Sequence, residues 1–186
     1  GVRAAGAVLH YAQNNLRRNA EHVTHLQPYA GQGFLLVDRI SQRHLELVEP
    51  LHAEGRDATL LATMDHTMTP MGSRLLRDWI LRPLLDLDKI NARLDAVSVL
   101  VADQLLLLEL RETLAAVKDL ERTISRLTVG SANARDLLSL QLGLAAIPGL
   151  RAILLGKPES ALLQNCRERL AELPELCELL PRALVD

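Results

Sequence analysis

The stretch that decides the fold is TPMGSRLLRDWILRP, residues 69–83. Thr69 can cap a helix, and Pro70 suits the first helical position because its fixed φ is already helical and its missing N–H is not needed there. Pro83 ends the helix. Apolar residues recur on one face (Met71, Leu75, Leu76, Trp79 and Ile80), and Ser73, Arg74, Arg77 and Asp78 occupy the other. The stretch therefore predicts an amphipathic helix that packs on its apolar side.

The sequence on both sides of this stretch is also helical in pattern. Apolar residues recur at helical spacing over 2–16, 60–65, 88–101, 105–117, 120–130, 133–147 and 159–173. Asn133 with Asp136 resembles a capping arrangement, and Gly130 is expected to end its helix in the left-handed conformation. Pro148 and Gly149 are expected to weaken or end the next helix. Residues 105–117 are leucine-rich nearly all round, which predicts burial on more than one side.

One segment, GFLLVD at residues 33–38, has the character of a strand. A lone strand leaves its backbone groups unpaired, so its expected partner is the alternating run at residues 45–48, unless the partner lies outside this chain. The predicted fold class is therefore mostly α, with at most a short strand pair near residues 33–48.

Length and composition exclude several classes of function. The 186 residues are enough to bury a sizeable core, and 21 basic residues nearly balance 23 acidic ones, so bulk charge indicates neither nucleic acid nor membrane as a partner. The aromatic content of 2% is too low for a base-stacking surface. No apolar run is long enough to span a membrane, and Cys166 and Cys177 indicate neither a zinc site nor a disulfide framework. We expect an excised piece of a longer cytoplasmic chain.

Few residues in the sequence could carry chemistry. His22 and His25 have the spacing of two metal ligands, but no third or fourth ligand is in phase with them. Carboxylate pairs that could serve acid–base chemistry are more typical here of helix caps and ion pairs: Asp86 with Asp88, Glu109 with Glu112, and Asp119 with Glu121. The sequence contains no phosphate loop, dinucleotide fingerprint, nucleophile elbow or HExxH motif. We therefore expect no catalytic, cofactor-binding or metal site in this chain.

Arg74, Arg77 and Arg82 are the candidate DNA-binding residues, because together they could form a basic edge that contacts phosphates. The alternative is a solvated face on which acidic neighbours such as Asp78 and Asp86 pair with these arginines. The orientation of the helix decides between the two.

The run MDHTMTPMGSRLLRDWILRPLLD, residues 64–86, resembles the central signature of the MutS family of DNA mismatch-repair proteins. Further segments resemble the family in the same order: AAGAVLHY at 4–11, VDRISQRHLEL at 37–47, INARLDAV at 90–97 and DLERTISRL at 119–127. His44 departs from the family pattern, which commonly has asparagine there. The resemblance covers essentially the whole chain.

This resemblance implies that residues 1–27 are a connector-exit helix and linker. Residues 28–186 would then be the first part of an elongated, multi-helix core or lever domain, truncated near the clamp insertion. In the family, mismatches are read by an N-terminal phenylalanine-x-glutamate motif and ATP is bound by a C-terminal phosphate-loop domain, and neither motif is in this sequence.

The resemblance implies no enzymatic activity for the chain itself, but a bacterial, cytoplasmic, homodimeric parent that is a DNA-dependent ATPase. The parent would bind mismatched double-stranded DNA, ATP and Mg²⁺, and the present segment would link the ATPase state to the DNA clamp. The residues alone leave open a helical module that contacts the DNA backbone and an unrelated helical protein-interaction domain.

Overall fold

The computed structural model describes residues 1–17, 20, 23–25, 33–52, 58–155 and 160–183. The chain forms two compact units, Gly1–Gln32 and Gly33–Asp186. The first unit contains α1 (Val2–Asn14), which confirms the helix predicted over 2–16. The domain boundary expected after residue 27 lies outside the described residues.

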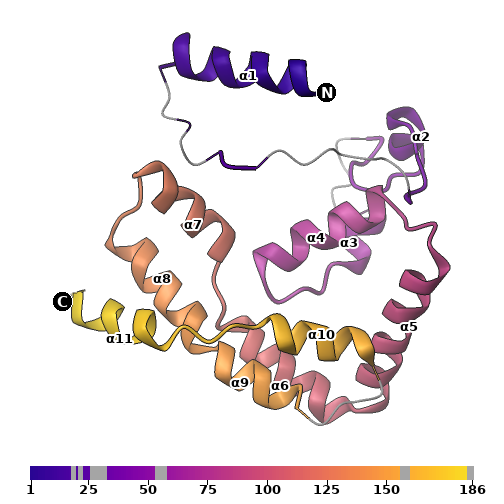
Figure 1. The fold of residues 1–186 in the computed structure, drawn as a ribbon. Coiled ribbons are helices and arrows are strands. Elements are labelled where there is room, and N and C mark those ends of the chain that lie inside the picture. Colours follow the sequence, from indigo (N-terminus) through magenta and orange to yellow (C-terminus); the bar gives the residue numbers. More distant parts are fainter. Residues whose placement is uncertain (18–19, 21–22, 26–32, 53–57, 156–159, 184–186) are drawn as a thin grey trace. The chain divides into compact units, whose positions relative to one another are not determined.

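The second unit carries the remaining helices (Figure 1). Their bounds are α2 Arg39–His44, α3 Leu60–Met64, α4 Pro70–Leu81, α5 Leu87–Ala102, α6 Gln104–Ala115, α7 Leu120–Val129, α8 Ala134–Ala145, α9 Ile147–Ile153, α10 Ala161–Arg169 and α11 Pro174–Ala183. Within the described residues no strand is formed, so the prediction of a mostly α fold is confirmed.

The helix ends follow the local signals in the sequence. The hydroxyl of Thr69 accepts the backbone N–H of Gly72 at 3.0 Å and so caps α4. Asn133 and Asp136 form a complete capping box at the start of α8. Gly130 ends α7 in the left-handed conformation with a φ of 73°. These predicted ends are confirmed.

The expected strand pair within residues 33–48 is wrong. Phe34 instead forms an isolated antiparallel bridge with Leu84, just beyond α4. The backbone N–H of Leu35 donates to the carbonyl oxygen of Pro83 at 2.7 Å. The true partner of this segment is therefore the chain that leaves α4.

The cause of this difference lies at Asp38. Its carboxylate accepts the backbone N–H groups of Ile40 and Ser41 at 2.9 and 3.0 Å, which starts α2 directly after the extended segment. Residues 45–48 follow α2 as turns and bends. The cap at Asp38 therefore ends the extended segment, and no hairpin with residues 45–48 is formed.

Two separate apolar clusters hold the later helices together. One contains Ala96 of α5, Leu154 after α9 and Leu163 of α10. The other contains Leu140 and Leu144 of α8 and Leu180 of α11. The helical chain is therefore built from small packed groups of helices, each with its own core.

The predicted burial of residues 105–117 on more than one side holds only for part of the helix. In α6 only Leu106 is buried, whereas the side chain of Leu105 is 79% exposed. Helix α6 packs against α5 and α9. An all-round leucine pattern gives burial only where another element covers each face, and within the described residues part of α6 has no such cover.

Besides Pro70, two further prolines stand at the starts of described helices. Pro148 lies in the first turn of α9, directly after α8 ends. The helix predicted over 159–173 is formed as α10, but it ends at Arg169, and α11, which Pro174 opens, was not predicted. Proline at the first helical position suits a helix start, and the residue before it disfavours the helical conformation, so α11 begins as a separate helix.

Residues 134–153, which comprise α8 and α9, are long and apolar enough to cross a membrane by length and composition. In the structure 22% of this stretch is buried, and both helices pack against other helices of the second unit. Helix α8 packs against α7 and α11, and α9 packs against α6. Asp136 also forms an ion pair with Arg126 at 2.8 Å, and Arg151 one with Glu172 at 3.0 Å.

Candidate functional site

The signature stretch at residues 64–86 begins with a hydrogen-bonded turn around Asp65. Its carboxylate accepts the backbone N–H of Thr67 at 3.1 Å and the hydroxyl groups of Thr67 and Ser73. These hydrogen bonds, that of Ser73 foremost, lower the pKa of Asp65 from its usual range. Ser73, expected on the solvent face, is half-buried, because it ties the first turn of α4 to the preceding turn.

Gly72 allows this turn to lie against the helix. A Cβ atom at this position would be 3.0 Å from the hydroxyl oxygen of Thr69 and 3.3 Å from the Cβ of Thr67. Any larger residue would push on the hydroxyl that caps the helix. The glycine therefore follows from the close approach of the turn to α4.

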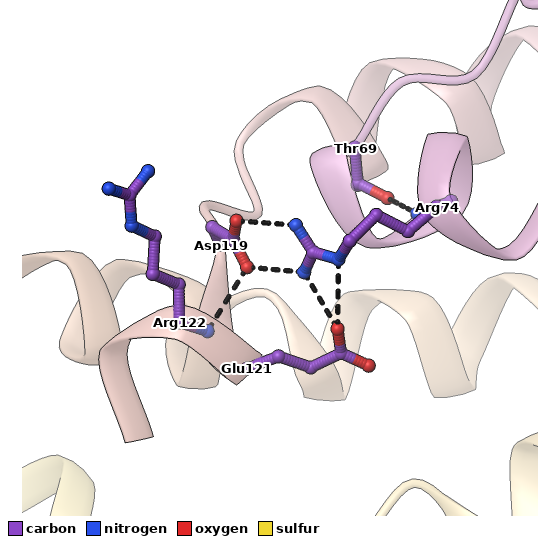
Figure 2. A network of polar contacts seen from close by, with 6 residues as sticks. Thr69, Arg74, Asp119, Glu121 and Arg122 are labelled. Carbon is purple, nitrogen blue, oxygen red and sulfur yellow. Dashed lines mark hydrogen bonds and ion pairs between the residues drawn. The ribbon is translucent and has the colours of Figure 1, made fainter. Parts of the chain in front are cut away.

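Arg74 joins α4 to α7 through two carboxylates (Figure 2). Its Nη1 and Nη2 donate to Oδ2 and Oδ1 of Asp119 at 2.8 and 2.7 Å. Its Nη2 and Nε also donate to Oε2 of Glu121 at 2.7 and 3.2 Å. The hydrogen bonds of Asp119, then those of Glu121, raise the pKa of Arg74 above its usual range, and Arg74 lowers the pKa of Asp119. The planar guanidinium is suited to holding two carboxylates at once.

Two more arginines connect the signature stretch to neighbouring helices. The guanidinium carbon of Arg93 in α5 lies 3.5 Å from the ring centroid of Trp79 in α4, a cation–π contact. Arg111 of α6 donates from Nη1 to the carbonyl oxygen of His66 at 2.9 Å. With Arg74, these side chains join the signature stretch to α5, α6 and α7.

The apolar stripe of α4 is less buried than its pattern predicts. The helix has no fully buried residue: Leu76 and Ile80 are half-buried, while the side chains of Leu75 and Trp79 are 51% and 38% exposed. Helix α3 packs on α4. The long arginine side chains, rather than apolar packing alone, therefore carry part of the connection to the later helices.

The other two candidate DNA-binding arginines lie in different surroundings. Arg82, directly after α4, forms an ion pair with Asp78 at 3.3 Å. Arg77 is exposed and lines a cavity of about 660 Å³ between α2, the chain that follows it, and α4. Arg74 and Arg82 therefore pair with carboxylates, and DNA binding by Arg74, Arg77 and Arg82 stays a prediction.

Two of the three acidic pairs supply helix caps and ion pairs, as the sequence indicates, whereas Glu109 and Glu112 form no ion pair within the described residues. Asp86 caps α5 and pairs with Lys89 at 3.0 Å, and Asp119 caps α7. The bond from Asp119 and Glu121 to Arg74 was not predicted, because it joins residues that are 45 and 47 positions apart. The only signal was a match of charge between an acidic pair at a helix start and an arginine in the signature stretch.

Metal ligation finds no support from geometry in the part of the chain that the structure describes. It contains no group of three or more histidine, cysteine, aspartate or glutamate side chains that could hold an ion. His25 is exposed, and its Nδ1 lies 3.0 Å from the hydroxyl of Thr24. His22 lies outside the described residues.

Comparison with known proteins agrees with the resemblance of residues 64–86 to the MutS signature. Residues 41–186 match the family described as MutS domain III. The chain is 43% identical to a DNA mismatch repair protein MutS of Methanosarcina barkeri over 100% of its own length and 21% of that protein. It is 42% identical to the MutS of Symbiobacterium thermophilum, over 98% of the chain and 21% of that protein. A third relative, the MutS of Lachnoclostridium phytofermentans, is 38% identical over the whole chain and 20% of its own length.

These matches show both the family and the extent of the chain. The chain spans about a fifth of the length of the curated relatives, so it is a fragment of such a protein. The signature turn at Asp65 and the helices of the second unit lie within the matched range. The chain therefore belongs to the MutS domain III family.

Proposed function

We propose that this domain is a lever in a DNA mismatch-repair protein, linking the nucleotide state of an ATPase domain to a clamp that closes on DNA. The observation that carries the proposal is the arginine connection of α4 to α7, in which Arg74 binds Asp119 and Glu121. Helices are stiff along their axes, and contacts between them exchange between discrete arrangements. Helix groups with separate cores, joined by polar side chains, suit the transmission of a domain movement.

The lever role assigns no chemistry to the chain itself. We place the binding of ATP and Mg²⁺ outside residues 1–186, because the sequence has no phosphate loop. Mismatched duplex DNA, a second copy of the parent, and its connector, clamp and ATPase domains are the partners that we propose for the parent. The family membership and the names of the relatives support this assignment.

The test measures coupling in the full-length parent. DNA affinity is measured with and without a non-hydrolysable ATP analogue, and nucleotide affinity with and without mismatched DNA. The ratio must be the same in both directions, because coupling between binding sites is reciprocal. The variants are Arg74→Ala and Leu76→Ala in α4, with Arg135→Ala on the exposed surface of α8 as the matched control.

A lever predicts that the α4 variants reduce the coupling ratio from a typical 5–150-fold to about 1–3-fold, while each affinity alone changes less. The control keeps the wild-type ratio. Unchanged coupling in folded α4 variants would show that α4 is not part of the transmission.

Direct contact of the domain with DNA is the competing function. A salt titration of duplex DNA binding in the parent separates the two, because each lost phosphate contact lowers the slope of log affinity against log salt by about 1. Arg77→Gln leaves this slope unchanged if the domain is only a lever.

A further inference from the structure

The groove between α2 and α4 combines an apolar floor with a basic rim. Its apolar lining is formed by Ile40, Val48, Leu51 and Leu81. The side chains of Ile40 and Leu51 are 69% and 40% exposed, so part of this floor faces solvent. A volume of about 660 Å³ is large enough for several side chains of a ligand.

The rim of the groove carries an excess of positive charge. Arg39, Arg43 and Arg77 line it together with His44, and Glu49 is the acidic residue among the lining side chains. All of these side chains are exposed. The lever role of α4 uses none of them.

These arginines differ from their neighbours in having no partner among the residues that the structure describes. Arg74 and Arg82 form ion pairs, and Arg111 donates to a carbonyl oxygen. Within the part of the chain that the structure describes, Arg39, Arg43 and Arg77 make no ion pair or hydrogen bond through their guanidinium groups. Guanidinium groups that line an apolar groove and have no partner among the described residues favour a ligand that carries both carboxylates and apolar side chains.

We propose that this groove docks an acidic segment with apolar side chains from another domain of the same polypeptide. The charges of such a segment complement the arginine rim, and its apolar side chains cover Ile40 and Leu51. A DNA backbone would satisfy the arginines but would leave the apolar floor uncovered.

The source of the segment follows from the length of the parent. The chain covers 21% of the relatives that it matches, so about four-fifths of such a protein lies outside it. A segment of the same polypeptide binds intramolecularly, so a weak contact is enough to hold a small groove occupied when the connection spans the distance. The docking goes beyond the lever role and does not depend on it.

The experiment places a photocrosslinker in the groove of the full-length parent. p-Benzoylphenylalanine replaces Ile40, the purified protein is irradiated without DNA or nucleotide, and crosslinked peptides are identified by mass spectrometry. The expected product is an intramolecular crosslink to one segment outside residues 1–186 that contains aspartate or glutamate. The same crosslinker in place of Val129, whose side chain is 61% exposed on α7, is the control for non-specific capture.

Charge reversal then tests the rim. The double variant Arg43→Glu and Arg77→Glu is expected to lower the crosslinked fraction about tenfold. Two exposed ion pairs are lost, and the new carboxylates repel the acidic segment. Arg43→Lys with Arg77→Lys preserves most of it, and Arg135→Glu on α8 changes nothing. Thermal unfolding of each variant checks that it is folded. If a variant does not fold, the crosslink from position 40 in the protein with the native rim still tests the proposal.

Four outcomes overturn the proposal. They are a yield no higher than that from position 129, a crosslink between two copies, a crosslink that charge reversal leaves unchanged, and replacement of the intramolecular product by a DNA adduct when duplex is added. Because the crosslink is measured without ATP or DNA, its failure leaves the coupling test of the lever role intact.

Discussion

The guanidinium of Arg74 forms two hydrogen bonds, of 2.7 and 2.8 Å, with the carboxylate of Asp119, the residue that caps α7. Asp119 also accepts the backbone N–H of Arg122 at 3.2 Å (Figure 2). One carboxylate therefore starts α7 and fixes α7 to α4. A movement of α4 that breaks the ion pair acts directly on the first turn of α7.

The two acidic partners of Arg74 are expected to contribute unequally to stability. The side chain of Asp119 is 21% exposed and also serves as a cap, whereas that of Glu121 is 67% exposed. Asp119→Ala should lower the free energy of unfolding by at least the ~1 kcal/mol typical of a lost cap. Glu121→Gln should change it by less than about 0.5 kcal/mol. Urea unfolding of the two variants measures the difference, and equal effects would contradict this ranking.

Close packing of α7 on α8 predicts a second contrast, between two glycines. A Cβ at Gly143 would lie 2.5 Å from Cδ2 and 3.2 Å from Cγ of Leu120, so Gly143→Ala forces that leucine to move. The substitution should be destabilising, because overpacking costs about 1–3 kcal/mol, whereas helix propensity returns only up to about 1 kcal/mol. At Gly149 the nearest atom, Cγ2 of Thr113, would be 3.7 Å away. Gly149→Ala should therefore stabilise α9 by up to about 1 kcal/mol through helix propensity. Thermal unfolding that shows the same sign for both variants would contradict the packing argument.

The helix caps were predicted correctly because their signals are local in the sequence. Thr69 and the box formed by Asn133 and Asp136 were predicted because a cap joins residues that are three positions apart. The bridge from Phe34 to Leu84 and the bond from Arg74 to Asp119 were not predicted. They depend on the tertiary arrangement, which periodicity and capping rules do not contain.

Burial was predicted less well than helix position, for a related reason. Apolar spacing marks which face of a helix can be buried, but not whether another element covers it. Leu105 and Trp79 lie on apolar faces that their sequences predict, yet 79% and 38% of their side chains are exposed. For the candidate site, the sequence identified Arg77 but gave no indication that Arg39 and Arg43 share its groove, because the groove depends on how α2 lies against α4.

The contact of Arg93 with the ring of Trp79 predicts a measurable coupling. Trp79→Leu removes the aromatic face, and Arg93→Met removes the charge while keeping most of the apolar stem. A double-mutant cycle should give a favourable coupling of about 0.5–1 kcal/mol, the range for a partly exposed cation–π pair. Each free energy is measured by urea unfolding. Additive effects of the two substitutions would show that the two side chains are only neighbours.

The hydrogen-bonded carboxylates also predict how stability depends on pH. The hydrogen bond from Ser73 lowers the pKa of Asp65, and that from Arg74 lowers the pKa of Asp119, in each case below the ordinary 3.8. A carboxyl group whose folded pKa is lowered binds protons first in the unfolded state. Its contribution to stability is therefore complete above about pH 4 and is lost as the pH falls through 3.8 towards the folded pKa.

The direction of this pH dependence can be tested with Asp119→Asn, which keeps a capping side chain but cannot ionise. The variant should be less stable than the wild type at pH 7, and the difference should shrink as the pH is lowered to 3, because the unfolded wild type then takes up a proton on Asp119 more readily than the folded protein does. Asp95→Asn is the control, since the Asp95 carboxylate is exposed on α5 and has no hydrogen-bond partner among the described residues. Urea unfolding at both pH values measures the two differences. A gap for Asp119→Asn that stays constant between pH 7 and pH 3 would mean that the carboxylate of Asp119 gains nothing from Arg74 in the folded state.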